Sequence, residues 1–225
     1  MNILVTGTSQ GIGRATALLF AKMGHKVYGF DVQPGTIQDA NYTHHIVDIT
    51  VESDYPTLPL IDILVNNAGI QCSDVCGGVI DVNLKGTISI TERYGIHSGI
   101  KAIVMVGSAS AHTGSEFPEY CASKSGLLAY VKNVAQRVSR WGATCNGVDA
   151  GGVITELNRP VLDDKRLWQS IMDVTPLKRW ATAEEIADWI YFLAVTQSFC
   201  TGQSIVIDGG ESIDSHFVWP SVKSS

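Results

Sequence analysis

The stretch TGTSQGIG (6–13) constrains the fold more than any other part of this chain of 225 residues. It follows the apolar run NILVT (2–6) and precedes apolar residues at helical spacing, so it predicts a tight turn from a buried strand into a helix. Gly7 permits the turn, Gly11 leaves space where a pyrophosphate could approach the backbone, and Gly13 lets the helix pack close to the strand. Backbone N–H groups at the helix N-terminus would face the phosphate charge. We therefore expect a dinucleotide-binding strand–helix unit, with a plain turn as the alternative.

Apolar runs typical of β-strands recur along the chain. Besides 2–6 they are KVYGFD (26–31), HIVDI (45–49), IDILVNN (61–67), KAIVMVGS (101–108), ATCNGVDA (143–150) and QSIVIDGG (203–210). Because most of these runs are nearly continuous in apolar residues, we expect strands buried on both faces, as in a parallel sheet between two layers of helices. The chain length suits one α/β domain better than two.

Three helices can be placed from apolar spacing and capping residues. The first is expected after Gly13, with Ala15, Leu18, Leu19 and Met23 facing inward and Gly24 as its stop. The second runs from about Tyr120 to about Trp141, with Leu127, Leu128, Val131, Val134, Ala135 and Val138 continuing the face of Tyr120 and Lys124. The third begins at Thr182, whose hydroxyl forms a capping box with Glu185.

One connection is unusually lean for this architecture. Only TVESDYPTLPL (50–60) joins two expected strands, and its two prolines oppose a regular helix. Part of one sheet face would then be thinly covered. Either the loop is simply trimmed, or the face packs on another subunit.

Composition excludes several classes of partner. The formal net charge of −6 argues against nucleic acid as a partner. The apolar run at 3–5 is too short for a signal peptide or a membrane span, so we expect a cytoplasmic protein. The five scattered cysteines fit reduced thiols. Cys72 and Cys76 lack a second pair with zinc-like spacing, so we expect no metal.

Asp31 ends the second expected strand, 24 residues after Gly7. A carboxylate there can accept hydrogen bonds from both hydroxyls of an adenosine ribose, whereas the 2′-phosphate of NADP would meet like charge. Gln10, directly before Gly11, offers no compensating cation. The sequence therefore favours NAD over NADP.

Five motifs in order resemble the short-chain dehydrogenase/reductase family over nearly the whole chain. They are TGTSQGIG, NNAG (66–69), VNLKG (82–86), GSAS (107–110) with YCASK (120–124), and TGQSIVIDGG (201–210). The resemblance implies a doubly wound Rossmann fold with a seven-stranded parallel sheet, some connecting helices being shortened here. It also implies oxidation of an alcohol or reduction of a carbonyl with a nicotinamide cofactor, in a homo-oligomer that is commonly a tetramer.

Proton transfer at oxygen must accompany hydride transfer at carbon, and it needs an acid/base with a suitable pKa. Lys124 lies one helical turn from Tyr120, so its charge would favour tyrosinate. Tyr120 is the expected acid/base, and Lys124 would tune it and hold the nicotinamide ribose. By resemblance, Ser108 orients the substrate oxygen, with Ser110 as a rival, and Asn83 helps to hold a proton-relay water or forms only a structural hydrogen bond.

The remaining expected cofactor-binding residues gather at the same motifs. With Tyr120 and Lys124 they are Gly7, Ser9, Gln10, Gly11, Ile12, Gly13, Asp31, Asp48, Ile49, Asn67, Ala68, Gly69, Gly151, Val153 and Thr155. By resemblance Asp48 meets the adenine amino group, although it could be only a turn residue. Ala150 replaces the family's proline, which puts the rigidity of that loop in question, and the segment from Gly69 to Asn83 is shorter than usual.

We expect one NAD(P)-binding Rossmann domain over 1–225, with a substrate loop at about 155–181. Val161, Leu162, Leu167, Trp168, Ile171 and Met172 form an apolar set there that either packs as a lid helix or also contacts substrate. If it contacts substrate, the set favours a small, largely apolar secondary alcohol or ketone, including a cyclic one, and GFD (29–31) and AHT (111–113) resemble dihydrodiol-type dehydrogenases. Alternatives are an NADP-using enzyme similar to 3-oxoacyl-carrier-protein reductases, a non-catalytic nucleotide-binding regulator or scaffold, and, more distantly, a methyltransferase.

Overall fold

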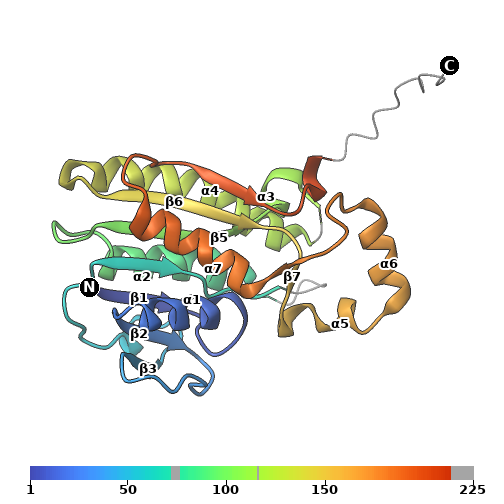
Figure 1. Ribbon diagram of the computed structural model, residues 1–225. Coiled ribbons are helices and arrows are strands. Elements are labelled where there is room, and N and C mark those ends of the chain that lie inside the picture. Colours follow the sequence, from blue (N-terminus) through green and yellow to red (C-terminus); the bar gives the residue numbers. More distant parts are fainter. Residues whose placement is uncertain (72–76, 116, 214–225) are drawn as a thin grey trace.

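A seven-stranded parallel sheet forms the centre of the molecule (Figure 1). The structure, a computed structural model, describes residues 1–71, 77–115 and 117–213. In spatial order the strands are β3 (Tyr42–Ile46), β2 (Lys26–Asp31), β1 (Asn2–Thr6), β4 (Ile63–Asn66), β5 (Ala102–Ser108), β6 (Thr144–Ala150) and β9 (Ser204–Ile207). The doubly wound fold and the seven-stranded sheet expected from the sequence are confirmed.

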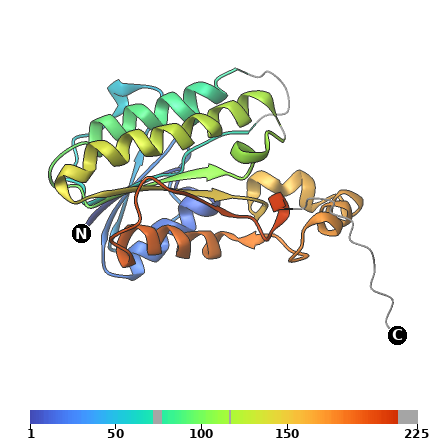
Figure 2. The same cartoon turned by 90° about the horizontal axis from the view of Figure 1, so that it is seen from above.

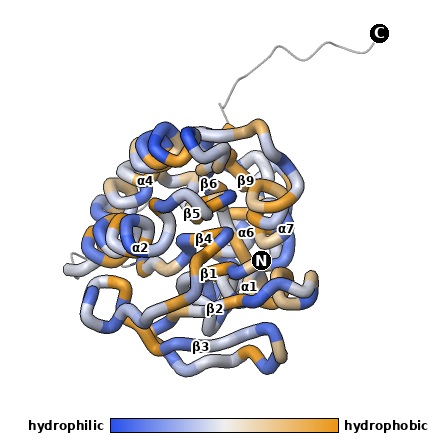
Figure 3. The backbone as a smooth tube through the Cα atoms, turned by 90° about the vertical axis from the view of Figure 1, so that its left-hand side faces the viewer, coloured by the Kyte–Doolittle hydropathy of each residue, from blue (hydrophilic) through white to orange (hydrophobic). Residues whose placement is uncertain are grey.

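Helices cover both faces of this sheet (Figure 2). Helices α1 (Gly11–Lys22) and α7 (Ala183–Tyr191) pack on one face, and α2 (Thr87–Tyr94) and α4 (Pro118–Val138) on the other. Figure 3 shows the two helix pairs on opposite sides of the sheet. Each face has its own apolar core, around Phe20 and Ile186 on one side and around Ile90 and Val131 on the other.

Shorter elements connect and extend these layers. They are the helices α3 (Ser110–Thr113), α5 (Arg159–Leu162) and α6 (Lys165–Val174), the 3-10 turns η1 (Glu52–Asp54), η3 (Ser139–Trp141), η4 (Glu156–Asn158) and η6 (Glu211–Ile213), and the π-helical turns η2 (Asp81–Gly86) and η5 (Phe192–Thr196). Strands β7 (Val153–Ile154) and β8 (Ala181–Thr182) form a separate parallel pair that closes the base of the α5–α6 segment. No helix in the described part of the chain is long and apolar enough to cross a membrane.

The inner face of α1 agrees only in part with the expected one. The helix begins at Gly11, two residues before Gly13, and its buried apolar side chains include Ala15, as expected, together with Ala17, Phe20 and Ala21. Leu18 and Leu19 lie on the flanks, and Met23 is 54% exposed. Gly13 determines which side of α1 faces the sheet, because it packs directly against the carbonyl of Gly7. Residues three, four, seven and eight positions after Gly13 lie on the same helix face and are therefore buried. Gly24 ends the helix at φ 80°, as expected.

The third strand begins and ends three residues earlier than expected, at 42–46 rather than 45–49. Its pairing with β2 ends opposite Asp31, where β2 itself ends. Beyond that point Asp48 caps a turn by accepting from the N–H and the hydroxyl of Thr50. The residues after Ile46 therefore line the adjoining cavity instead of extending the sheet.

The lean connection contains no regular helix, as its prolines predicted; all of its residues are described, and only η1 forms. Aromatic side chains fill part of the space, since the ring of Tyr94 contacts those of Phe30 and Tyr55 at centroid distances of 5.6 and 6.0 Å. The Tyr55 hydroxyl donates to the Ile49 carbonyl. Leu60 remains 64% exposed, so a loop rather than a helix covers this part of the sheet face, beside α2.

The other two expected helices agree with the structure. Helix α4 and the turn η3 together run from Pro118 to Trp141. The Thr182–Glu185 capping box at the start of α7 is present in both directions. Cys72 and Cys76, which lie in the shortened segment after Gly69, fall outside the described residues.

Candidate active site

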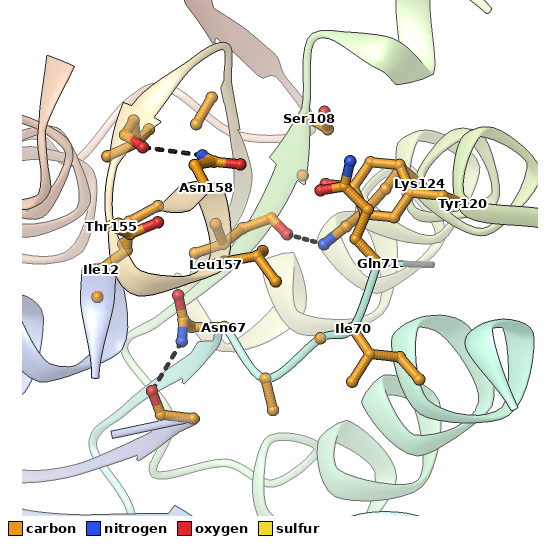
Figure 4. A pocket seen from close by; sticks show the side chains of 18 of the residues that line it. Ile12, Asn67, Ile70, Gln71, Ser108, Tyr120, Lys124, Thr155, Leu157 and Asn158 are labelled. Atoms are coloured by element: carbon orange, nitrogen blue, oxygen red, sulfur yellow. Dashed lines mark hydrogen bonds between the residues drawn. The ribbon is translucent and has the colours of Figure 1, made fainter. Parts of the chain in front are cut away.

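A cavity of about 1040 Å³ lies at the carboxyl ends of the strands (Figure 4). Residues at or after the ends of six sheet strands, β1 to β6, line it, together with α4 and the segment from β7 to β8. In a doubly wound sheet this edge is where ligands bind. The cavity thus collects most of the residues that the sequence motifs singled out.

The glycine turn forms the floor of the cavity at the start of α1. Gly7 and Gly11 have φ values of 74° and 53°, which side chains disfavour. A Cβ at Gly13 would lie 2.0 Å from the Gly7 carbonyl oxygen, so only glycine allows the helix to start so close to the strand. Gly7, Gln10, Gly11 and Ile12 line the cavity, whereas Gly13 lies buried beneath it. This shape fits a pyrophosphate held by backbone N–H groups.

Asp31 is fixed at the end of β2 by two backbone donors. Its carboxylate oxygens accept from the N–H groups of Ser9 and Gln33, each at 2.9 Å. Ser9 itself does not line the cavity, so it acts on the site by holding Asp31. Within the described lining, the side chains near Asp31 carry no positive charge.

The adjoining wall is made by the ends of the third and fourth strands. Asp48, Ile49, Asn67, Ala68 and Gly69 all line the cavity. The Asn67 side chain donates to the carbonyls of Thr6 and Gly7 at 2.9 and 3.1 Å, and so ties the β4 end to the glycine turn. Its amide thus supports the turn.

Tyr120 and Lys124 face the cavity from one side of α4, as Figure 4 shows. The ammonium of Lys124 lies 5.7 Å from the centroid of the Tyr120 ring and donates to the Val106 carbonyl at 2.9 Å. Only 5% of Lys124 is exposed. Burial lowers the pKa of Lys124 to about 8, with the charge of Asp149 acting in the opposite direction.

Ser108 and Ser110 lie together at the end of β5, and both line the cavity. The Ser108 hydroxyl donates to the Ser110 hydroxyl at 3.0 Å, and it also accepts from the Ser110 N–H at 3.2 Å. Ser108 is held at the strand end, whereas Ser110 begins α3. The two hydroxyls expected as rivals are therefore hydrogen-bonded neighbours.

Asn83 lies behind the cavity wall in the π-helical turn η2 and is 1% exposed. Its amide pairs with both backbone groups of Ile70, at 2.8 and 2.9 Å, and donates to the Ser123 hydroxyl. A Cβ at Gly69 would lie 3.1 Å from the Asn83 amide oxygen and 3.5 Å from the Lys124 ammonium, so the three groups meet at one point.

The loop after β6 is anchored by hydrogen bonds although Ala150 stands where the resemblance would place a proline. Ala150 accepts from the Ala109 N–H at 2.9 Å, and Gly151 donates to the Ile207 carbonyl at 3.0 Å. Gly151, Val153 and Thr155 line the cavity, as expected. A Cβ at Gly11 would lie 3.3 Å from the Thr155 methyl carbon, so this loop reaches the glycine turn.

Several lining residues had not been singled out from the sequence. They include Ile70, Gln71, Phe117, Leu157, Asn158 and Trp180. Trp180 packs flat against Gly152, where a Cβ would lie 1.9 Å from the indole nitrogen, and the glycine pair at 151–152 was the available signal. Of the expected apolar set in the 155–181 segment, Val161 and Ile171 line the cavity, while Trp168 packs edge-on against Trp180.

Known proteins share this sequence pattern and fold. A family model described as enoyl-(acyl carrier protein) reductase matches residues 7–212. The chain is 31% identical over 248 residues to glucose 1-dehydrogenase of Gluconobacter oxydans (strain 621H), covering 96% of this chain and 93% of that protein. It is 32% identical over 235 residues to a 3-oxoacyl-[acyl-carrier-protein] reductase of Rickettsia felis, covering 92% and 95%. A 4-hydroxyisoleucine dehydrogenase complexed with NADH superposes with a TM-score of 0.86 at 25% identity, over 95% of this chain and 99% of that one.

Sheet topology and relatives agree on the class: a Rossmann-fold oxidoreductase that acts on a CH–OH or carbonyl group with a nicotinamide cofactor. The chain belongs to the short-chain dehydrogenase/reductase family. The resemblance drawn from its motifs is thereby confirmed.

Proposed function

We propose that this protein is an NAD-dependent enzyme that interconverts a small, largely apolar secondary alcohol and its ketone. The observation that carries the proposal is the buried Lys124 ammonium, 5.7 Å from the ring of Tyr120, in the same cavity as Ser108 and Asp31. One cavity thus holds a possible acid/base, a positive charge beside it, a hydroxyl donor and a carboxylate that can bind a ribose.

Asp31 supports NAD as the cofactor. Each of its oxygens accepts one backbone hydrogen bond and keeps further acceptor capacity for a ribose hydroxyl. A 2′-phosphate would meet a fixed negative charge there. We assign the pyrophosphate to the turn at Gly7–Gly13, the adenine side to Asp48, Ile49 and the 67–69 strand end, and the carboxamide side to Val153 and Thr155.

Tyr120 is the proposed acid/base. A bound nicotinamide supplies the hydride acceptor or donor. Tyr120 accepts the proton of the alcohol oxygen in oxidation and returns it in reduction. The positive charge of Lys124 stabilises the tyrosinate form, and Asn83, buried at the same point as Lys124, steadies the wall from which a water could exchange protons with the lysine.

Ser108 is proposed to orient the substrate oxygen. Its hydroxyl donates to Ser110 in the structure; turned toward the cavity, it can donate instead to an oxygen that gains negative charge, a role that oriented donors fill in many active sites. Ser110 holds Ser108 in place rather than replacing it, because its hydroxyl accepts from Ser108 and its backbone N–H donates to Ser108.

The substrate end of the cavity supports the substrate class. Phe117, Leu157, Val161, Ile171 and Trp180 line it, and four of these lie in the 155–181 segment. Such a lining favours apolar groups around the reacting carbon, including cyclic ones.

A substrate panel with NAD and NADP side by side tests the proposal. We expect turnover of at least one small secondary alcohol, with NAD preferred. NADH binding without turnover of any alcohol or ketone would instead favour a non-catalytic nucleotide-binding regulator or scaffold.

A second candidate is reduction of 3-oxoacyl thioesters with NADPH, because the chain is 32% identical to a 3-oxoacyl-[acyl-carrier-protein] reductase. Asp31 argues against NADPH. Including a 3-oxoacyl thioester with each reduced cofactor in the same panel separates the two candidates.

We further propose a single domain over 1–225 in a cytoplasmic homo-oligomer, a tetramer or a dimer. Phe199, Phe192 and Trp189 are 99%, 43% and 39% exposed, which is costly for a monomer. Light scattering coupled to size-exclusion chromatography measures the assembly; a monomer at micromolar concentration would contradict it.

A further inference from the structure

Asp149 carries a buried carboxylate that the proposed reaction does not use. The residue is 1% exposed, lies near the end of β6 and is not among the described cavity-lining residues. Cys145, four residues earlier on the same strand, packs in the core beneath α4. Because side chains alternate along a strand, Asp149 points to that same sheet face, from which Lys124 approaches.

Gly107 makes the space that this carboxylate occupies. Gly107 pairs with Asp149 in the β5–β6 register, and a Cβ at Gly107 would lie 1.8 Å from a carboxylate oxygen of Asp149. The carboxylate therefore rests on the β5 backbone. The next residue back, Val106, accepts the hydrogen bond of the Lys124 ammonium at 2.9 Å. The Asp149 carboxylate and the Lys124 ammonium therefore contact adjacent residues of β5, Gly107 and Val106.

His112 holds the other carboxylate oxygen. Its Nε2 lies 2.5 Å from Asp149 Oδ2, and its side chain is 34% exposed while that of Asp149 is 2% exposed. His112 comes from α3, the short helix that also carries Ser110. Burial raises the pKa of Asp149, and the hydrogen bond of His112 and the charges of His112 and Lys124 act against that rise. The carboxylate thus depends on its neighbours to stay ionised.

Within the described part of the chain, Asp149 is the carboxylate whose charge acts on Lys124. Three titratable side chains surround Lys124. Tyr120 comes from the same helix, Asp149 comes from β6, and His112 of α3 contacts Asp149. Strand β5 contributes the Val106 carbonyl, and η2 contributes the neutral amide of Asn83. The charged residues of η2, Asp81 and Lys85, are exposed and pair with each other at 2.7 Å.

We propose that Asp149 and His112 are positioning residues for the proposed reaction: the carboxylate, held by the imidazole, keeps Lys124 protonated and thereby favours the tyrosinate form of Tyr120. The inference rests on the proposed function, in which Tyr120 is the acid/base. The proposal links three electrostatic interactions: His112 with Asp149, Asp149 with Lys124, and Lys124 with Tyr120. No proton has to move between these groups.

Tyrosinate absorbance tests this without any substrate. The difference between the wild type and Tyr120→Phe, followed across pH in the free and the NAD-saturated protein, reports the ionisation of Tyr120. With Asp149→Asn we expect this ionisation to move up by about one pH unit, because Lys124 then loses its proton at lower pH. His112→Ala should shift it in the same direction, and His112→Gln, which can still donate to Asp149, should restore most of the wild-type titration.

Asp62→Asn is the matched control. Asp62 also pairs with a lysine, Lys101 at 2.8 Å, but at the opposite end of the sheet. It should leave the Tyr120 titration unchanged. The proposal is overturned if the Tyr120 titration of Asp149→Asn is unshifted, or shifts no more than that of Asp62→Asn. If Asp149→Asn does not fold, an unshifted Tyr120 titration in His112→Ala overturns it instead. NAD binding and turnover are scored separately, so a failure of the proposed function remains distinguishable.

Discussion

The ammonium of Lys124 donates to the carbonyl oxygen of Val106 at 2.9 Å, which joins helix α4 to the end of strand β5 beside the cavity. A carbonyl accepts the hydrogen bond but brings no full negative charge. Much of the lysine's charge is therefore left to act on Tyr120, four residues away on the same helix. Burial makes this charge costly and lowers the pKa of Lys124 to about 8.

Lys124 should make stability depend on pH in a defined window. The pKa of Lys124 is about 8 in the folded protein against 10.5 for an unperturbed lysine, so the unfolded chain binds more protons between these values and stability rises with pH there. Relative to Lys124→Met, the wild type should gain up to about 3 kcal/mol across the window. Chemical denaturation of both proteins at a series of pH values measures this. A difference that stays constant with pH would contradict the burial of a charged lysine.

Asp31→Asn should relax the cofactor preference. It keeps the shape of the side chain but removes the charge, so NADH binding should weaken by about tenfold and NADPH binding should improve. Fluorescence titration with both cofactors measures the ratio. Asp39→Asn, which changes a carboxylate outside the described cavity lining, is the control and should leave the ratio unchanged. An unchanged ratio in Asp31→Asn would show that Asp31 does not contact the ribose.

The two serines should differ in their effect on turnover. Ser108→Ala should lower kcat by about 10² to 10³-fold, as expected for a lost donor at a developing oxyanion. Ser110→Ala should cost much less, because its hydroxyl accepts from Ser108 rather than donating to it, and the backbone N–H that donates to Ser108 is kept. Steady-state kinetics at saturating cofactor decides the matter, and the reverse order of effects would make Ser110 the orienting residue.

Gly13→Ala should damage the cofactor turn by steric conflict alone. Its Cβ would lie 2.0 Å from the Gly7 oxygen and 2.4 Å from the Asn67 amide nitrogen, so the turn must shift or the chain must unfold. We expect NADH affinity to fall by more than about 100-fold, the equivalent of about 2.7 kcal/mol. Gly142→Ala is the comparison. No atom of the described residues other than its chain neighbours lies within 4 Å of a Cβ at Gly142, and its φ is 73°, so the substitution should cost about 1 kcal/mol of stability and leave NADH affinity unchanged. Near-normal NADH binding by Gly13→Ala would refute the close-packing account.

Local patterns in the sequence predicted those parts of the site that depend on short-range geometry. The spacing of Tyr120 and Lys124 places them on one helix face, and Asp31 follows from the end of a strand. The glycine turn follows from its position between a strand and a helix. These features depend on neighbours a few residues away, which a sequence displays directly.

Features that depend on distant partners were missed or misplaced. The contact of Gly13 with Gly7 and Asn67 determines which face of α1 packs on the sheet. Met23 is therefore exposed, although its position in the apolar pattern predicted that it would face inward. The Asp149–His112 pair joins residues 37 positions apart through space that only a glycine on a third element leaves open. Neither relation leaves a periodic signal in the chain.

The most direct test of the account is Tyr120→Phe, assayed on an alcohol that the wild type oxidises. We expect NADH affinity within about twofold of the wild type and a loss of turnover of about 10³-fold or more, because the acid/base is gone while the cofactor turn is intact. Turnover equal to that of the wild type in this variant would contradict the central claim that Tyr120 carries the proton.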